Sequence, residues 1–448
     1  MKRRYLALLL CLVLSLSAAG AAQAVTIDEY GDLFHAVLDN MMDHYAWEDD
    51  EFGNPIIGNW DGDEMYDSTL FAPDILYRLA LDPDYGDEAA RERAFVLAEQ
   101  TVEYETGVLF EYLFGNEAVM MEAFAGAPCL IDAFKVSRNP FYNLVLTAAL
   151  SRVRGIVAEE PNFLGDYMGY VCANGLVGFY SLYFADVEKI LTAGGAQDIG
   201  LEVIGETIER YWDDEAGRFW PIDNLYENGW MLMGLAYAYG ATANGEYKVM
   251  ADAVMHEIDT NLWDDVSGDG GYWEYEDYTY KPALGRWKKL STHERIARAM
   301  LHWFEVTGDT GYLDQARKML TYTEGHLCAE DCCQPGETVC YHHWTETTGL
   351  PHAIADPEDP GYDPYYDNPF CTGCNFNLLI DIYLLNKFVQ EADNYPRPIG
   401  ACGRLASGRA PIAASAGGLM LVLPAAFILV MKRFRGRPGT AAPPTEGH

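Results

Sequence analysis

Carboxyl groups lie beside aromatic rings in several segments of this sequence, and a protonated and an ionised carboxyl group together can cleave a glycosidic bond. Asp223 and Glu227 lie between Trp220 and Trp230. Aromatic rings of this kind form the walls against which sugars stack. We therefore expect Asp223 or Glu227 to act as the acid, and Trp220, Trp230 and Trp287 to line the subsites. The structural alternative for Asp223 is a helix N-cap.

A second candidate is His293, which lies in the segment Ser291-Thr292-His293-Glu294. Ser291 and Glu294 match the capping box S-x-x-E, which is a sufficient structural reason for both. Capping does not explain His293. The dipole at the amino end of a helix disfavours a proton on the imidazole, so His293 could serve as a neutral base.

Two further segments combine the same residue types. His343, Trp344 and Glu346 place a base, a ring and a carboxylate close together, with packing or metal binding as alternatives. Trp60 and Asp61 begin an acidic segment that is typical of a loop, whose carboxylates could simply be solvated. We expect His343 and Glu346 as catalytic candidates, and Trp60, Asp61 and Trp344 as substrate-binding candidates.

Both termini carry targeting signals. Residues 1–24 combine a basic start, an apolar run and an A-x-A cleavage site, which predicts a signal peptide removed before Val25. Residues 412–431 carry no charge and at 1.5 Å per residue can span the ~30 Å hydrocarbon core as one transmembrane helix. The basic residues 432–448 then predict a cytoplasmic tail. The intervening domain is expected at the cell surface or on the periplasmic side.

Residues 394–411 are rich in Pro, Gly and Arg and predict a linker. Its Cys402, the apolar span and the basic cluster resemble the tripartite C-terminal sorting tags of some Gram-negative bacteria, the Myxo-type tags among them. The resemblance implies a sorting protease as a partner and a span that is removed. Without such a tag, the membrane anchor is permanent.

Six cysteines gather in one stretch: Cys328, Cys332, Cys333, Cys340, Cys371 and Cys374. An even number in an exported chain favours disulfides, and six cysteines allow 15 pairings that the sequence does not distinguish. The alternative is zinc, because Cys371 and Cys374 have the spacing of a ligand pair and Cys340, His342 and His343 could complete a tetrahedron. We predict disulfides, with no metal and no cofactor.

The formal net charge of −38 argues against nucleic acid as a partner. The sequence contains no G-x-S-x-G, P-loop, H-E-x-x-H or dinucleotide fingerprint. These absences argue against serine hydrolases, nucleotide enzymes and zincins.

The elements that position the candidates are expected to be helical hairpins. Residues 25–393 exceed the usual single-core limit of about 250–300 residues, so they form two domains or one toroidal repeat fold. Trp230 to Tyr239 is apolar on every side, whereas the helix after Gly245 is apolar along one stripe, as inner and outer rings require. A Trp-Asp-Asp turn at Trp212 recurs at Trp263, and strand signals are confined to these turns.

The T-G-D-x-x-Y-L connector from Thr307 to Leu313 and the turn from Trp263 to Trp273 resemble the six-hairpin glycosidase-like superfamily. Its members are (α/α)6 toroids, including glycoside hydrolases, unsaturated glucuronyl hydrolases and N-acylglucosamine epimerase relatives. The resemblance implies an all-α, (α/α)6-type toroid of six or seven hairpins over residues 25–393. It also implies a substrate mouth formed by loops at the ends of the inner helices.

These observations predict an extracytoplasmic carbohydrate-processing enzyme, a glycoside hydrolase with paired carboxylates in an aromatic-lined cleft. A non-catalytic surface module that binds glycan or a protein partner through the same mouth is one alternative. A Cys/His zinc-dependent lyase or cyclase is the other. The expected partners are a carbohydrate and, through the C-terminal helix, a membrane.

Overall fold

The computed structural model describes residues 25–43, 45–49, 55–60, 71–83, 85–114, 127–137, 139–159, 170–188, 195–219, 225–265, 270–273, 287–330, 338–340, 343–345, 350–351 and 372–397. All of them belong to the first of two units, residues 1–403. The predicted signal peptide (1–24), transmembrane helix (412–431) and tail (432–448) lie outside the described residues. None of the described helices is both long enough and apolar enough to cross a bilayer.

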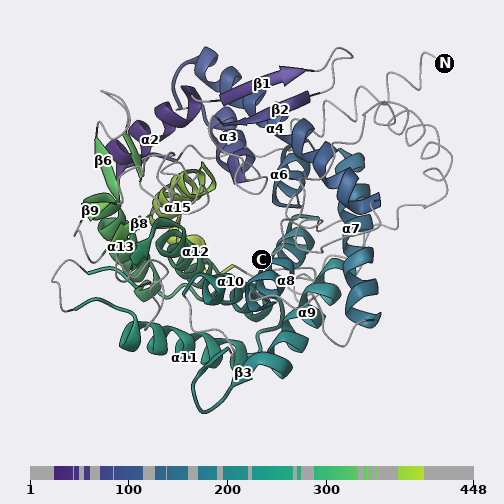
Figure 1. The fold of residues 1–448 in the computed structure, drawn as a ribbon, viewed down its shortest axis with the longest axis vertical. Coiled ribbons are helices and arrows are strands. Elements are labelled where there is room, and N and C mark those ends of the chain that lie inside the picture. The colour runs from purple at the N-terminus through teal and green to yellow at the C-terminus, as the bar shows by residue number, and fades with distance from the viewer. Residues whose placement is uncertain are drawn as a thin grey trace, which may run out of the picture. The chain divides into compact units, whose positions relative to one another are not determined.

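Twelve α-helices of the described part of the chain alternate between an outer and an inner ring (Figure 1). The outer helices are α2 (Gly31–Asp43), α4 (Glu88–Phe114), α7 (Pro140–Glu159), α9 (Gly195–Tyr211), α11 (Gly245–Asn261) and α13 (Gly311–Tyr322). The inner helices are α3 (Ala72–Leu81), α6 (Ala127–Ser137), α8 (Tyr170–Glu188), α10 (Leu225–Thr242), α12 (Leu290–Thr307) and α15 (Thr372–Gln390).

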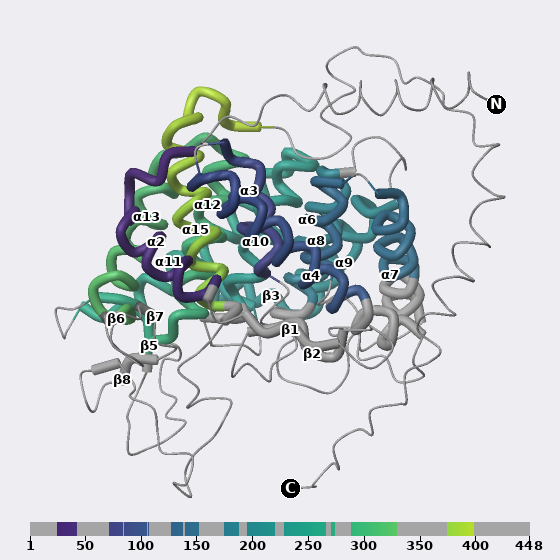
Figure 2. Tube along the Cα trace, turned by 90° about the horizontal axis from the view of Figure 1, so that it is seen from above, coloured from purple at the N-terminus to yellow at the C-terminus, as the bar shows by residue number. Residues whose placement is uncertain are grey.

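The inner ring is closed. Each inner helix contacts the next one along the chain, and α15 contacts α3. Each also contacts at least one of the outer helices that flank it in sequence. Figure 2 shows the two rings from the side, with the helices running roughly along the common axis. This arrangement confirms the predicted toroid of helical hairpins, with six hairpins in the described residues.

Helix patterns follow the two rings as expected. α10 is buried on all sides from Asn228 to Ala238, and α12 is buried over nearly its whole length. α11 instead buries one stripe that includes Val254 and Ile258, and its amino end is capped by the Asn244 side chain, which accepts from the Glu246 N–H at 3.1 Å. Burial on all sides therefore identified inner helices correctly.

Short strands connect the helices, and they are more widespread than the sequence indicated. The predicted Trp-Asp-Asp turn forms the hairpin β3 (Trp212–Asp213) with β4 (Arg218–Phe219), and its repeat forms a bridge between Trp263 and Tyr272. The expectation that strands occur only at these turns was wrong. Further pairs join β1 (Tyr45–Asp49) to β2 (Pro55–Trp60), β6 (Cys328–Glu330) to β7 (Thr338–Cys340), and β8 (His343–Thr345) to both β5 (Trp287–Lys289) and β9 (Leu350–Pro351). A π-helix, η2 (Thr323–Leu327), and a 3-10 helix, η3 (Ala392–Asn394), complete the elements.

The start of the described chain is bound to its last helix. The backbone N–H groups of Asp28 and Glu29 both donate to Oδ1 of Asn386 at 2.9 Å. The amide of Asn386 returns a bond to the Glu29 carbonyl at 3.0 Å, and the Val25 N–H donates to Oδ2 of Asp82 at 3.2 Å. These bonds join the first and last hairpins of the ring.

The chain continues along the ring after α15. Arg397, which the sequence assigned to the linker, donates its backbone N–H to the Glu305 carbonyl at 3.0 Å. Its guanidinium pairs with the carboxylates of Glu305 and Asp186, the latter at 2.8 Å. The segment up to Arg397 is therefore part of the folded domain.

Cysteines of the described residues differ in state. Cys328 and Cys374 are disulfide-bonded, whereas Cys129 is a free, fully buried thiol. The β6–β7 register places Cys328 opposite Cys340. Cys332, Cys333 and Cys371 lie outside the described residues. A disulfide-bonded sulfur offers no thiolate to a metal, so Cys374 gives no support to the zinc alternative.

Candidate active site in the lumen of the inner ring

The polar side chains that converge in this domain lie inside the inner ring. They form two layers that share Arg298 of α12. One layer lies near the amino ends of α10, α12 and α15, and the other lies towards the carboxyl ends of α8, α12 and α15. The amino ends of α10 and α12 are at the same level, because a Cβ on Gly229 would lie only 2.6 Å from Cγ of Arg295.

The first layer contains a buried carboxyl group, Glu294, which is 2 % exposed. Its Oε1 accepts a hydrogen bond from the Asn377 amide at 3.3 Å, across the lumen from α15. Burial raises the pKa of Glu294 well above its ordinary value, and the negative charge of Asp381 raises it further against the opposing charge of Arg295. Burial in the lumen therefore favours the protonated form of Glu294, which can donate a proton.

A second carboxyl group lies one turn after Asn377 on the same face of α15. Asp381 is completely buried and forms an ion pair with Nε of Arg298. Burial raises the pKa of Asp381 to about 6 despite the attraction of Arg298, so this group is ionised at neutral pH. The layer thus combines a carboxyl group whose pKa is raised well above its ordinary value with one whose pKa is about 6.

Aromatic rings and a guanidinium form the wall next to Glu294. The Arg295 guanidinium lies 3.9 Å from the centroid of the Trp230 ring and 5.6 Å from that of Phe71. The Phe71 and Trp230 rings are stacked with centroids 6.2 Å apart. A cation over an indole face is a favourable arrangement, and it fixes the orientation of both side chains.

Three buried polar atoms of this layer have no hydrogen-bond partner among the described residues: Oε2 of Glu294, Oδ2 of Asp381 and Nε1 of Trp230. More than nine tenths of buried polar groups in proteins are paired, because an unpaired one costs about 1–3 kcal/mol. Three such atoms at one level of the lumen are the signature of a site that is completed by a ligand or by water.

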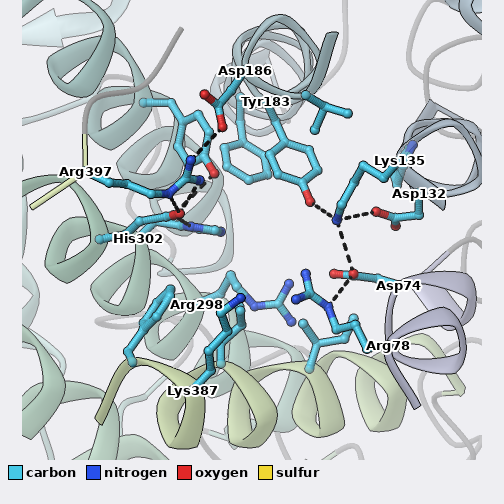
Figure 3. A pocket seen from close by; sticks show the side chains of 18 of the residues that line it. Asp74, Arg78, Asp132, Lys135, Tyr183, Asp186, Arg298, His302, Lys387 and Arg397 are labelled. Carbon is cyan, nitrogen blue, oxygen red and sulfur yellow. Dashed lines mark hydrogen bonds and ion pairs between the residues drawn. The ribbon is translucent and has the colours of Figure 1, made fainter. Parts of the chain in front are cut away.

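The second layer is a cavity of about 550 Å³ bordered by all the inner helices (Figure 3). On one side, Lys135 bridges Asp132 at 3.0 Å and Asp74 at 3.6 Å, while Arg78 binds Asp74 at 2.7 Å. Burial and the nearby charge of Asp74 raise the pKa of Asp132 to about 6.

On the opposite side of this cavity, Nδ1 of His302 lies 2.9 Å from Oε2 of Glu305. Burial alone would raise the pKa of Glu305, but the charge of Arg397 and the hydrogen bond from His302 hold it at about 2. Arg397 thus borders the carboxyl end of the lumen with its charge neutralised.

His293 has a structural position. Its ring is completely buried; Nε2 accepts the Tyr272 N–H at 2.9 Å, and Nδ1 lies 2.6 Å from the Lys289 carbonyl. Burial lowers the pKa of His293 to about 4, so the ring is neutral as expected. Both nitrogens are engaged by the backbone, however, so the geometry leaves no atom for base catalysis.

The residue missed by the sequence reasoning is the neighbour of His293. α12 begins at Leu290, and Lys289 is its N-cap, with no side-chain capping bond. Ser291 and Glu294 therefore lie within the helix, and the capping-box interpretation was wrong. Glu294 contacts Asn377 across the lumen instead, which only the three-dimensional arrangement reveals.

Only some of the other predicted site residues lie within the described parts of the chain. Trp230 lines the first layer beside Glu294, where it is buried under the Arg295 guanidinium. Glu227 lies in the first turn of α10, Trp60 ends β2 and Trp287 starts β5. In the β5–β8 register His343 is opposite Lys289 and Trp344 opposite Lys288, which brings this strand to the amino end of α12. Asp61, Trp220, Asp223 and Glu346 lie outside the described residues.

Within the described parts of the chain, no three His, Cys, Asp or Glu side chains are arranged to hold a metal ion. The chemistry available in the described lumen is that of carboxyl, guanidinium, amine and aromatic groups.

Comparison with known proteins agrees with this architecture. The family model for N-acylglucosamine 2-epimerase (GlcNAc 2-epimerase) matches residues 207–352, a stretch that contains Trp230 and Glu294. No curated protein sequence matches the chain.

Several solved structures share the fold. The glycoside hydrolase family 76 α-mannanase of Bacteroides thetaiotaomicron is similar over 81 % of this chain and 98 % of its own, with 11 % identity and a TM-score of 0.52. An unsaturated glucuronyl hydrolase variant from Streptococcus agalactiae is similar over 81 % and 92 %, with 9 % identity and a TM-score of 0.55. An inactive α-1,6-mannanase variant of Salegentibacter, in complex with α-1,6-mannotetrose, is similar over 80 % and 99 %, with 13 % identity and a TM-score of 0.50. The fold is thus one that carbohydrate-active enzymes use.

Proposed function

We propose that this chain is a carbohydrate-processing enzyme that hydrolyses glycosidic bonds outside the cytoplasm, with Glu294 as the general acid. The observation that carries the proposal is the environment of Glu294: the group is buried, burial raises its pKa well above the ordinary value, and Oε2 is unpaired among the described residues. A general acid for glycoside cleavage must hold its proton at neutral pH until the leaving oxygen takes it. The similarity to folds of sugar-active enzymes supports the substrate class.

Asp381 contributes as a positioning residue. Its buried charge adds to the effect of burial on Glu294 and keeps the proton on that group, while Arg298 holds Asp381 in place. Trp230 lines the same side of the lumen, and its ring, which lies under the Arg295 guanidinium, orients that cation beside Glu294.

The second carboxylate of the mechanism is proposed to come from the amino end of α10. Glu227 lies two residues before Gly229, whose backbone packs against Arg295 next to Glu294. This contact brings the backbones of the first turns of α10 and α12 together. Asp223, just before α10, is the other candidate for this role.

The test is an assay of hydrolysis on defined oligosaccharides, including α-1,6-mannan fragments and unsaturated glucuronyl disaccharides. The measured signal is the release of reducing ends. Glu294→Gln should lower kcat by about 10²–10⁴-fold, the usual contribution of a general acid, with an unchanged circular dichroism spectrum. Glu209→Gln, an exposed change on α9, is the matched control and should retain activity.

Two results would redirect the proposal. Binding of glycan without any turnover by the wild-type protein would favour the non-catalytic module. Interconversion of sugar isomers without release of reducing ends would favour epimerisation, which the family match to residues 207–352 makes the second candidate.

A further inference from the structure

The cavity in the second layer is large enough for a ligand of its own. Its volume of about 550 Å³ lies within the ~300–1,000 Å³ range of small-molecule sites. It lies one turn or more beyond Glu294 along α12, since Arg298, His302 and Glu305 face it. Apolar and aromatic side chains cover part of its wall, among them Phe71, Phe179, Tyr180, Ile380 and Leu384.

Most carboxylates of this wall are already paired. Asp74 is bound by Arg78 at 2.7 Å, and Asp132 by Lys135 at 3.0 Å. At the other side, Asp186 and Glu305 are both bound by Arg397. These four acidic groups thus have cationic partners within the wall itself.

Some nitrogen atoms of the cationic side chains in this wall have no hydrogen-bond partner among the described residues. Arg78 binds Asp74 through Nε alone, so among the described residues its two terminal nitrogens make no hydrogen bond. Arg298 binds Asp381 through Nε and the Asn377 carbonyl through Nη2 at 2.9 Å, which leaves Nη1. The ammonium group of Lys387 forms no hydrogen bond and no ion pair with any described residue, although the Lys387 carbonyl accepts the Glu391 N–H at 2.9 Å.

These three side chains converge. Figure 3 shows the guanidinium groups of Arg78 and Arg298 pointing towards each other across the cavity, with Lys387 extending from α15 towards the same space. The pKa of Lys387 agrees with this geometry. Burial lowers it, and the charge of Arg78 lowers it further, against the smaller opposing effect of Glu391. Arg78 and Arg298 are each paired on one side, with Asp74 and Asp381, so the hydrogen-bond donors that remain on the three cations are available to an anion in the cavity.

We propose that Arg78, Arg298 and Lys387 form a site for the anionic group of a small molecule, a carboxylate or a phosphate, whose apolar part lies against the aromatic wall. Two guanidinium groups match the paired oxygens of either anion, and the ammonium adds a third charge-assisted bond. The site goes beyond the proposed hydrolysis, because binding in this cavity requires no reaction at Glu294.

The experiment is calorimetric titration of the full-length protein with glucuronate, glucose and inorganic phosphate at low salt. Glucuronate and glucose differ mainly in the carboxylate, so the site requires glucuronate, phosphate or both to bind and glucose not to. Binding of phosphate alone identifies a phosphate site, and binding of glucuronate alone identifies an acidic-sugar site. Binding of neither overturns the proposal, as does equal binding of glucuronate and glucose.

Lys387→Met tests the location. It breaks no hydrogen bond or ion pair with the described residues, so the fold should survive, and the dissociation constant for the anion should rise about tenfold or more. Lys318→Met makes the same substitution on the outer helix α13. It is the matched control and should bind the anion as the wild type does. An unchanged affinity in Lys387→Met would overturn the assignment. Glu294→Gln should retain the anion, which separates failure of this site from failure of the hydrolase.

Discussion

Arg298 of α12 is bound by the carboxylate of Asp381 of α15, a residue 83 positions further along the chain. The pair lies at the boundary between the two layers of the lumen. Its anionic side adds to the raised pKa of Glu294, and its cationic side borders the larger cavity. One buried ion pair therefore links the protonation of the proposed acid to the charge of the neighbouring cavity.

Asp381→Asn should shift the pH profile of the enzyme. Asp381 raises the pKa of Glu294, so its removal, together with the release of Arg298, should lower that pKa. The alkaline limb of kcat/KM, which reports loss of the proton from the acid, should then move to lower pH. A merely structural role would reduce activity at every pH and leave this limb in place, so the full profile is the measurement.

His293 should make the protein sensitive to acid. Its folded pKa of about 4 lies below its unfolded value near 6.5, so its contribution is present above pH 6.5 and is lost as the pH falls through 4. The shift corresponds to roughly 3 kcal/mol of unfolding free energy. Urea unfolding at pH 7, 5.5 and 4.5 measures it. His293→Gln should have a lower free energy of unfolding than the wild type at pH 7. Its free energy of unfolding should fall less on acidification than that of the wild type.

His256→Gln, an exposed change on α11, serves as the comparison for that series. It should follow the wild type at each pH. If the wild type and His293→Gln lost stability in parallel, the acid sensitivity would have to come from another group.

Gly175→Ala should force two inner helices apart. A Cβ at Gly175 would lie 2.6 Å from the Met231 backbone nitrogen and 2.7 Å from the Trp230 carbonyl carbon. Backbone cannot move aside as a side chain can, so we expect a loss of about 1–3 kcal/mol. Gly205→Ala, which meets nothing within 4 Å on α9, should instead be neutral or gain up to ~1 kcal/mol. Thermal unfolding of both variants, with Trp fluorescence as the signal, compares them directly.

Arg397→Met should destabilise the domain although the residue lies after the last α-helix. It would leave the buried Glu305 without its arginine partner and remove the bond to Asp186. Breaking a buried pair costs about 3–5 kcal/mol, and because the Arg397 side chain is 30 % exposed we expect roughly 2–3 kcal/mol. Denaturant unfolding checks this. A variant as stable as the wild type would show that the segment after α15 is not part of the cooperative unit.

The fold was predictable because inner and outer helices alternate along the chain, and the two kinds differ in how much of their surface is buried. The inner helix α10 is apolar on all sides over most of its length, whereas the outer helix α11 carries one apolar stripe. This alternation depends only on local sequence. The strands β1, β2 and β6 to β9 were missed because segments of two to six residues carry too short a pattern to recognise.

The site was predictable only in part. The segment around His293 does reach the lumen, but through Glu294, which the sequence assigned to a cap, whereas both ring nitrogens of His293 are engaged by the backbone. That error followed from one position: with the helix starting at Leu290, Glu294 lies in the lumen instead of closing the first turn.

The larger cavity carried no sequence signal that could have revealed it. Asp74 with Arg78, and Asp132 with Lys135, have the i,i+4 and i,i+3 spacing of ordinary surface ion pairs. Nothing in the sequence distinguishes such pairs from those that face a lumen. Only the closure of the ring shows that they lie inside it.

The bond between Glu29 and Asn386 has a consequence for synthesis of the protein. The two residues are 357 positions apart, so the contact that closes the ring forms only after almost the entire domain has been made. Contacts of such sequence separation form slowly, and incomplete chains expose apolar surface meanwhile. Until α15 arrives, the growing chain is an open arc whose inner helices lack a neighbour. A chain cut short before this helix should therefore aggregate instead of folding into a smaller ring.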